Sequence, residues 1–578
     1  MINQAKYKNP KAANVEIDKD TFNLTIEEQE DENLFFDNSN VNQDFQVFIE
    51  NCKNIDTEID ILLVHQFLTL LSQNSSLPFG LIINTNFIHS ITSKLYKSQS
   101  PDDTIVLLKA LKILMSNINY PKEYLIKFIA PLLTSIINFF IKSIAPFLNS
   151  IITVSDKKIV EISLDCLLFI SNNNIMNLFF IRSYKQEGQI QADEYIQNLW
   201  NILLYFLPDY SSKDSINICQ MIIQILGTFC SNIEQEIIKI VFNKLKSLIV
   251  DSYYYSFLAL GNIEKFSNYS PLNLKTMAHC HGILSIQNFL LIVHSEYEDK
   301  KVELADLIRE LKKVNSERSE IIQKIELFEK GKFSTSNFLN FLTNEIQNNF
   351  YLASFQQINQ RMNEITTAES ISMNILFNFV INSNFNDLDS PLLLKLIKKF
   401  DYQRNIDLAI NTLKFMKEVI KCFNPFQSLF LDDTSLFQLL INFSIFSTFS
   451  IRIEAGYLIT QLIRIANRSY LSKLIEFKII GSAIQLIGEI QNVDLFSELC
   501  ESLCKLIDMN FGKLVLQDLL GVIDSIKEMG MSNESEEATV AANILIKKIE
   551  KLENMNAEQN MNAEQNMNAE QNMNAEQI

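Results

Sequence analysis

Short apolar segments that resemble one another recur along this chain of 578 residues, each near the end of a helix-like run. Four of them are Leu-Lys-Ile-Leu-Met-Ser-Asn at 111–117, Leu-Leu-Phe-Ile-Ser-Asn at 167–172, Ile-Leu-Gly-Thr-Phe-Cys-Ser-Asn at 225–232 and Leu-Ala-Leu-Gly-Asn-Ile at 258–263. The fullest is Ile-Arg-Ile-Glu-Ala-Gly-Tyr-Leu-Ile-Thr-Gln at 451–461. Polar breaks and further apolar helix patterns follow, and self-similar three-helix units with a period of roughly 40 residues are typical of α-solenoids. The sequence therefore predicts an all-α solenoid, which is expected to be a binding surface rather than an enzyme.

Composition supports this fold and narrows the kind of partner. Gly (12) and Pro (10) are scarce, which leaves little material for the turns of an all-β protein. An apolar fraction of 47% is ample for a continuous core. The formal charge of −18 argues against direct binding to nucleic acid, because phosphate binding needs a basic surface. We expect protein or peptide partners and no nucleic acid.

The sequence contains no pattern of an export or membrane segment. Residues 1–10 lack the apolar run of a signal peptide. The longest uncharged apolar stretch, 128–141, has 14 residues and contains Pro131, whereas a spanning helix needs roughly 20 residues. Eight cysteines spread from Cys52 to Cys504 do not form a disulfide framework. We expect no membrane association and a reducing compartment, cytosolic or nuclear.

Composition and periodicity divide the chain into five parts. They are an acidic, mostly disordered segment over 1–57, a first run of repeats over 58–295, a long, charged helical insertion over 296–366, a second run of repeats over 367–552 and a low-complexity tail over 553–578. The first part is too polar and acidic to fold alone. The tail consists of four copies of Asn-Met-Asn-Ala-Glu-Gln, and its low apolar content predicts that it does not fold.

The insertion carries apolar stripes with the alternating spacing of three and four residues that is typical of a coiled coil. The members of the first stripe are Leu304, Leu307, Leu311, Val314, Arg318, Ile321, Ile325 and Phe328. The second stripe, after Gly331, consists of Phe355, Ile358, Met362 and Ile365. Two interpretations stay open: two elongated repeat helices packed on each other, or a projecting hairpin that recruits a partner or dimerises.

Several segments, in order along the chain, resemble the armadillo repeats of importin-α. They are 58–95 (with His-Gln-Phe-Leu-Thr-Leu-Leu-Ser), 257–263 (Phe-Leu-Ala-Leu-Gly-Asn-Ile), 454–461 (similar to the family's Glu-Ala-Ala-Trp-x-x-x-Asn helix) and 521–527 with 541–552 (similar to its closing repeat). Tyr7-Lys8-Asn9 and residues 32–41 match the two ends of the family's importin-β-binding segment. The resemblance implies an armadillo-type solenoid with a right-handed superhelix. It also implies an adaptor for nuclear protein import, in cytoplasm and nucleus, that binds nuclear localisation signals as extended cargo peptides.

The resemblance also implies which residues form the cargo groove. In the family, an Asn on an inner helix of each repeat hydrogen-bonds the cargo backbone, and a Trp one turn earlier forms a slot for a lysine side chain. The corresponding Asn positions here are Asn117, Asn172, Thr228, Asn262 and Gln461. The Trp positions are Ile113, Leu168, Gln224, Leu258 and Tyr457, of which only Tyr457 is aromatic. Because Asn is also a common helix-capping residue, a structural role for these side chains stays open.

Two departures from the family pattern affect the predicted function. Loss of a Trp face removes a cation–π attraction of about 0.5–2 kcal/mol per slot. This predicts weak binding of plain lysine-rich signals and a preference for peptides with apolar side chains between fewer lysines. The position of the family's basic N-terminal triplet reads Asp37-Asn38-Ser39. Importin-β or an export receptor is therefore the least supported of the implied partners, because an acidic segment cannot imitate a basic one.

Catalytic patterns are lacking in the sequence. It contains no Gly-rich phosphate loop. The run His279-Cys280-His281 has no second ligand pair at metal spacing, so these residues are interpreted as core or surface residues. We predict no enzyme activity, no cofactor and no metal. Two functions stay open: an importin-α-like cargo adaptor, and an armadillo scaffold outside transport, for instance in a cytoskeletal assembly.

Overall fold

The apolar periodicity of the sequence is realised entirely as helices. The computed structural model describes residues 43–55, 59–73, 81–82, 85–98, 100–116, 154–172, 190–208, 212–228, 235–251, 255–269, 271–331, 334–346, 349–382, 388–489, 492–531 and 535–575. Within these ranges every regular element is a helix and none is a strand. The predicted all-α solenoid is therefore confirmed.

The helices fall into three groups along the chain. The first group contains α1 (Gln43–Lys53), α2 (Ile61–Gln73), α4 (Phe87–Lys97), α5 (Pro101–Ser116), α7 (Val154–Asn172), α9 (Ile190–Phe206), α10 (Lys213–Gly227), α11 (Gln235–Asp251), α12 (Ser256–Tyr269) and α13 (Pro271–His279). The second contains α14 (Gly282–Val314), α15 (Ser319–Glu329), α16 (Thr335–Phe341), a π-helix at Leu342–Ile346 and α17 (Asn349–Asn382). The third contains α18 (Ser390–Ile397), α19 (Ile406–Cys422), α20 (Asn424–Asp432), α21 (Thr434–Phe446), α22 (Phe449–Ile465), α23 (Arg468–Glu476), α24 (Ile479–Ile487), α25 (Val493–Asp508), α26 (Gly512–Gly521), α27 (Ile523–Met531) and α28 (Glu536–Ala575).

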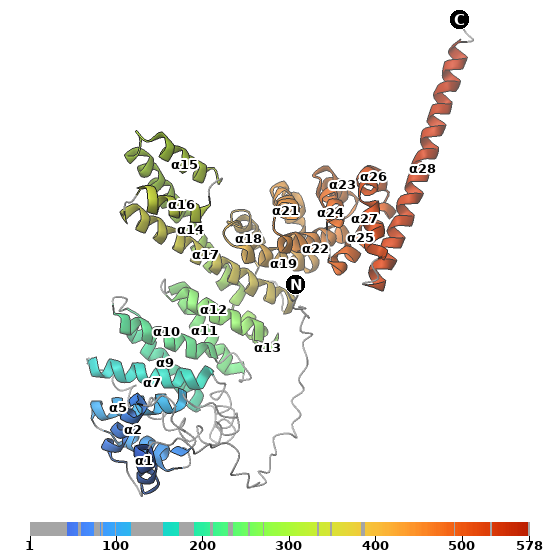
Figure 1. The fold of residues 1–578 in the computed structure, drawn as a ribbon. Coiled ribbons are helices and arrows are strands. Elements are labelled where there is room, and N and C mark those ends of the chain that lie inside the picture. Colours follow the sequence, from blue (N-terminus) through green and yellow to red (C-terminus); the bar gives the residue numbers. More distant parts are fainter. Residues whose placement is uncertain are drawn as a thin grey trace, which may run out of the picture.

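One helix of each repeat packs against its counterpart in the next repeat. These helices, called the central row below, are α5, α7, α10, α12, α17, α19, α22, α25 and α28, and Figure 1 shows them following one another through the molecule. The last four begin at Ile406, Phe449, Val493 and Glu536, a period of about 43 residues, which is within the range of helical repeats. The buried apolar side chains form one core that extends from α1 to α28.

Asparagine and aspartate side chains fix where several helices begin. Asn405, Asn467 and Asn492 each accept a hydrogen bond from the backbone N–H three residues later, at 3.2, 3.0 and 2.8 Å. Asp389 accepts one from Leu392 N at 3.0 Å. Such an N-cap stabilises a helix by about 1 kcal/mol. Part of the chain's high Asn content therefore serves helix starts, at α19, α23 and α25.

The N-terminal boundary of the fold lies earlier than the predicted residue 57. The helix α1 covers 43–53, and Phe48 in it is fully buried. The Phe48 ring centroid lies 5.8 Å from that of Phe67 on α2 and 5.2 Å from that of Phe87 on α4. These aromatic contacts bury enough apolar surface to anchor α1 although the surrounding sequence is acidic.

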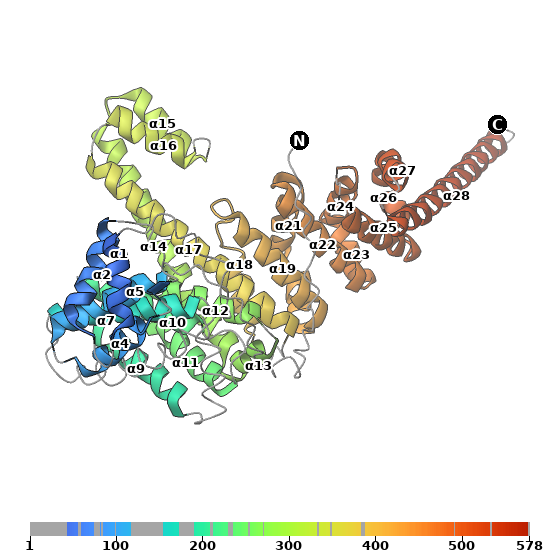
Figure 2. The ribbon, with the colours of Figure 1, turned by 60° about the horizontal axis from the view of Figure 1, so that its bottom comes forward.

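The insertion, called the arm below (residues 296–366), extends the second and third helices of a single repeat. That repeat begins with α13, and its α14 and α17 pack on each other. Figures 1 and 2 show α15 and α16 at the far end of α14 and α17, away from the central row. The arm is thus built from two elongated repeat helices, and it also projects. Recruitment of a partner or dimerisation by the arm stays a prediction.

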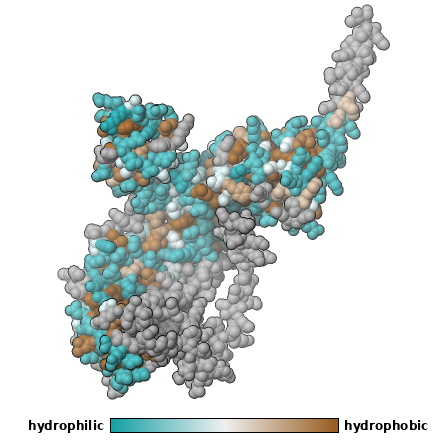
Figure 3. All heavy atoms as spheres, in the orientation of Figure 1, coloured by the Kyte–Doolittle hydropathy of each residue, from teal (hydrophilic) through white to brown (hydrophobic). Residues whose placement is uncertain are grey.

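The predicted coiled-coil stripe of the arm is interrupted. Leu311 is fully buried, but α14 ends at Val314, whose side chain is 66% exposed, and Arg318 stands before α15 with a non-helical backbone. Asn315 ends α14, because its Nδ2 donates to the Leu311 carbonyl oxygen at 2.9 Å. The chain turns back there, and most residues of the two apolar stripes are buried inside the arm. The visible surface of the arm is accordingly mostly hydrophilic (Figure 3).

The tail is helical, which corrects the prediction that it does not fold. The helix α28 runs from Glu536 through the hexapeptide copies to Ala575. Its first part is anchored in the core, where Ala542, Leu545 and Ile549 are fully buried. Because this part supplies the helix nucleus, the Met, Ala, Glu and Gln residues of the copies can extend the helix without a new nucleation cost.

Removal of residues 553–578 is expected to lower the helix content without lowering the stability. Among the described residues, no side chain after Leu552 belongs to the core. Circular dichroism should therefore show less helix signal and a midpoint of thermal unfolding within about 2 °C of the full chain. Truncation after Val540 is the control, because it also removes the three fully buried residues of α28 and should lower the midpoint clearly. A lower midpoint for the first truncation would show that the tail supports the fold.

Candidate peptide-binding groove on the central row

The predicted slot residues lie on helices of the central row. Ile113, Leu168, Gln224 and Leu258 lie on the consecutive row helices α5, α7, α10 and α12, and Tyr457 lies on α22. Gln224 is exposed, and the other four are partly buried. Since α17 and α19 lie between α12 and α22 in the row, two helices that the sequence alignment did not include occupy its middle.

The predicted backbone-binding positions differ in what the structure shows of them. Asn117 lies outside the described residues, and only the backbone of Asn172, at the end of α7, is described. Thr228 ends α10, and its hydroxyl donates to the Ile225 carbonyl oxygen at 2.7 Å. Gln461 is partly exposed on α22. The parts that resemble the importin-β-binding segment, 7–9 and 32–41, also lie outside the described residues.

Asn262 has a structural role, which is a contact between two helices and not the helix capping that the sequence left open. Its side chain is 2% exposed, and its Nδ2 donates to the carbonyl oxygen of Ile223 on α10 at 3.0 Å. Gly227 makes room for it, because a Cβ atom at position 227 would lie 2.1 Å from Asn262 Oδ1. The Asn262 amide nitrogen thus fastens α12 to α10 and is not available to the backbone of a bound peptide.

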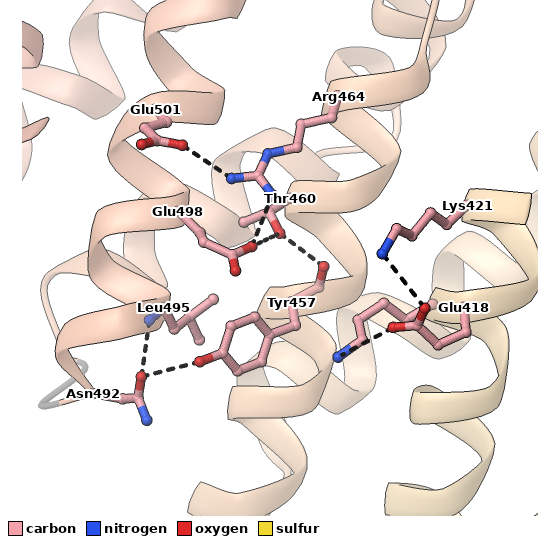
Figure 4. Close-up of polar contacts among 10 residues, drawn as sticks. Glu418, Lys421, Tyr457, Thr460, Arg464, Asn492, Leu495, Glu498 and Glu501 are labelled. Atoms are coloured by element: carbon pink, nitrogen blue, oxygen red, sulfur yellow. Dashed lines mark hydrogen bonds and ion pairs between the residues drawn. The ribbon is translucent and has the colours of Figure 1, made fainter. Parts of the chain in front are cut away.

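Tyr457 is held between its neighbours in the row. Its hydroxyl points toward Asn492 and donates to Oδ1 at 3.3 Å, as Figure 4 shows. The Nζ atom of Lys417 on α19 lies 5.0 Å from the centre of its ring. Burial, together with the carboxylates of Asp494 and Glu498, raises the pKa of Tyr457 to about 12, so the hydroxyl stays a neutral donor. The Tyr457 ring therefore already has an ammonium group of this chain over one of its faces.

Other polar side chains of the row join adjacent helices. Arg464 on α22 donates to Glu498 and Glu501 on α25 at 3.1 Å each (Figure 4). Asn378 on α17 donates to the Ser267 hydroxyl on α12 at 3.1 Å. Exposed ion pairs contribute little to stability, but these contacts fix the alignment of the row helices.

A cavity of about 600 Å³ opens on the row between α12, α17, α19 and α22. Carboxylates of Glu264, Asp407 and Glu454 line it, against a single ammonium group, that of Lys414. Further polar lining groups come from Thr367, Ser370, Asn405, Asn411 and Ser450. The cavity is therefore acidic and rich in hydrogen-bonding groups, and it suits a cationic ligand with polar backbone groups.

Glu454 and Asn411 have unused hydrogen-bonding capacity in this cavity. Burial raises the pKa of Glu454, although the ammonium groups of Lys417 and Lys414 oppose the shift. Its Oε2 is buried and has no hydrogen-bond partner among the described residues. The Asn411 Nδ2 donates to the Ser370 carbonyl and hydroxyl oxygens at 3.2 and 3.0 Å, which leaves the Asn411 Oδ1 as an acceptor.

Of the residues Glu454, Asp407 and Asn411 at the acidic cavity, only Glu454 lies in one of the near-repeated segments of the sequence. Glu454 belongs to the repeated segment 451–461, in which the family pattern had assigned only Tyr457 and Gln461 to the groove. Asp407 and Asn411 lie on α19, which carries none of the near-repeated segments. Only the packing of α19 between α17 and α22 brings them to the cavity.

A second cavity, of about 1070 Å³, lies where α16 of the arm approaches α12 and α17. Its apolar lining side chains are Phe257, Leu258, Leu339, Phe355, Ala368 and Ile371. It includes Leu258, one of the predicted slot residues. Thr367 and Ile371 line both this cavity and the acidic one, so the two cavities adjoin along α17.

The described residues contain no arrangement of His, Cys, Asp and Glu side chains that could hold a metal ion with three or more ligands. The run His279-Cys280-His281 forms the turn between α13 and α14, where His281 adopts a left-handed backbone with φ 57°. His279 Nδ1 lies 2.6 Å from the Lys275 carbonyl oxygen, and Cys280 is buried. Among all the residues that the structure describes, no single helix is long and apolar enough to span a membrane. The helices α13 and α14 pass the same test of length and composition only when taken together, as a pair bent by 75°.

No protein-family model and no curated protein matches this sequence. Among solved structures, a chain from a study of the phosphorylation-controlled interaction between cadherin and β-catenin is 10% identical, with a TM-score of 0.40, over 87% of this chain and 94% of that one. The crystal structure of SYS-1 gives 11% identity and a TM-score of 0.38 over 80% and 74% of the two chains. An engineered protein gives 11% and 0.37 over 80% and 98%. The first two are distant similarities to armadillo-repeat proteins, and they concern the fold alone.

Proposed function

We propose that this chain is a protein-binding scaffold that holds an extended, basic segment of its partner in the acidic cavity of the central row. The observation that carries the proposal is that Glu264, Asp407 and Glu454, from three different row helices, line one cavity with a single lysine. A partner's ammonium or guanidinium group would pair with these carboxylates at the cavity wall. The Asn411 Oδ1 could accept a hydrogen bond from the partner's backbone.

A narrower version of this proposal is an importin-α-like cargo adaptor, for which the basic segment is a nuclear localisation signal. The alternative is an armadillo scaffold outside transport, whose basic partner is part of a structural assembly. A pull-down with the full chain from nuclear and cytoplasmic extracts distinguishes them. Recovery of importin-β or an export receptor supports the adaptor, and basic partners without a transport receptor support the scaffold.

Substitution Glu454→Gln is expected to weaken the binding of a lysine-containing peptide by about tenfold, because it removes one of the three carboxylates that line the acidic cavity. The stability of the free protein should stay the same or increase, since ionisation of a buried carboxyl group is unfavourable. Fluorescence anisotropy with a labelled peptide that carries two lysines in a Gly/Ser background measures the affinity. Glu528→Gln, at an exposed position on α27 outside the cavity, is the matched control. Equal affinities of the two variants would contradict the proposed site.

The pH dependence of binding gives an independent check. Burial raises the pKa of Glu454 in the free protein, and a bound ammonium group would lower it. Binding then releases a proton, so the affinity is full above the pKa of the free protein and decreases as the pH falls through it. The same titration with Glu454→Gln should show a flatter profile. An affinity that rises toward acid pH in the unmodified protein would be the opposite of this expectation.

A further inference from the structure

The apolar cavity beside the arm is lined by apolar side chains that the fold leaves only partly buried. Phe257 and Leu258 reach it from α12, Leu339 from α16 of the arm and Ile371 from α17, and all four are only partly buried. Apolar side chains that stay partly exposed at the wall of a cavity of about 1070 Å³ can gain from burial against a ligand. The arm supplies one wall, so this cavity exists only because the repeat helices α14 and α17 are extended.

The two charged residues that line this cavity, Arg361 and Glu364, are paired with each other. The guanidinium carbon of Arg361 lies 4.6 Å from the centre of the Phe257 ring. Its Nε and Nη2 donate to the Glu296 carboxylate at 2.6 and 3.0 Å, and its Nη1 donates to Glu364 at 3.0 Å. Arg361 therefore covers part of the aromatic wall without giving the cavity a net positive charge. The chemistry of this cavity favours apolar side chains, in contrast to the acidic cavity next to it.

We propose that the apolar cavity binds large apolar side chains of the same extended segment whose basic side chains enter the acidic cavity. This inference rests on the proposed function and specifies the partner: basic residues and large apolar residues must occur at a fixed separation. The two cavities share Thr367 and Ile371, and from Thr367 the apolar cavity continues along α17 to Phe355. At about 1.5 Å of helix rise per residue, this places its apolar wall up to roughly 20 Å from the acidic cavity. An extended chain covers this distance in about three to six residues.

A set of synthetic peptides tests the separation directly on the full chain. Each peptide carries two adjacent lysines in a Gly/Ser background, with a Leu-Phe pair placed from about one to eight residues away on either side. The matched probe has Ser-Ser in place of Leu-Phe. We expect peptides with a separation of about three to six residues to bind about tenfold more tightly than the Ser-Ser probe. Equal affinities at every separation would overturn the inference.

Blocking the cavity from the arm side gives a second, independent measurement. Ser336 is exposed on α16 and lines the cavity, so Ser336→Trp should fill it without disturbing the core and abolish the gain from Leu-Phe. Asn337→Trp places the same side chain at the neighbouring exposed position, which does not line the cavity, and should keep the gain. Circular dichroism confirms that both variants are folded. A gain from Leu-Phe that persists in Ser336→Trp would place the apolar contact elsewhere and overturn the inference.

The outcomes separate this inference from the proposed function. Glu454-dependent binding of the Ser-Ser probe without any gain from Leu-Phe would leave the proposed function standing and remove the inference. Absence of binding by every lysine-containing peptide would remove both. A gain that depends on Ser336 and disappears when the lysines are replaced by serines supports both together.

Discussion

Substitution Gly227→Ala is expected to destabilise the protein by about 2–5 kcal/mol, because it disrupts the packing of two adjacent row helices. The new Cβ atom would lie 2.1, 2.3 and 3.0 Å from Oδ1, Cγ and Cβ of Asn262. The Asn262 side chain cannot simply turn away, since its own Cβ is among the contacted atoms. Displacement would also leave the buried amide without its bond to the Ile223 carbonyl oxygen. Urea unfolding followed by circular dichroism measures the loss.

A second glycine provides the control for this experiment. Gly261 lies on α12 next to Asn262, and a Cβ atom there would have no neighbour within 4 Å. Gly261→Ala should therefore leave the stability unchanged or raise it by up to about 1 kcal/mol through helix propensity. Similar losses from both substitutions would show that the α10–α12 contact is not the cause.

Phe48→Ala is expected to cost about 3–5 kcal/mol, the usual range for truncation of a fully buried aromatic side chain. It removes the ring of α1 that contacts both Phe67 and Phe87, and with it the attachment of α1 to the first repeats. In a solenoid each repeat contacts only its neighbours, so the loss should be local. Hydrogen exchange should become faster in α1, α2 and α4 and stay unchanged in α25 and α28.

Val47 is the matched control for Phe48. It precedes Phe48 on α1, but its side chain is 48% exposed. Val47→Ala should change the free energy of unfolding by no more than about 0.5 kcal/mol. If Phe48→Ala were equally mild, α1 would not be an integral part of the solenoid.

The class of fold followed from the sequence because it depends on local patterns. Repeated apolar segments at a constant period predict helices that must stack on their neighbours to bury their apolar faces. The same reasoning was less successful at the ends and in the arm. The aromatic contacts of Phe48 involve residues far along the chain, and the helix of the tail depends on the buried first part of α28. The break at Asn315 lies inside a stripe that the sequence presents as continuous.

The candidate site was decided by tertiary structure. Asn262 and Asn411 are both asparagines in apolar helices, and the family pattern assigned only Asn262 to the groove. Asn262 is buried because Gly227 of the preceding row helix leaves space for it, whereas Asn411 lies at the wall of a cavity. The rotation of each helix against its neighbours determines which of its faces is open, and this rotation depends on side chains of other repeats.

The position of the acidic cavity also depends on packing between helices, in this case helices that lie far apart in the sequence. Glu264, Asp407 and Glu454 belong to three helices, and the arm with its long helices stands between the first and the others in the chain. The sequence by itself determined that this protein is a helical solenoid, since periodic burial of apolar side chains is a local requirement. Only the stacking of α17 and α19 between α12 and α22 decided where its carboxylates meet, because that position is set by packing between repeats and not within them.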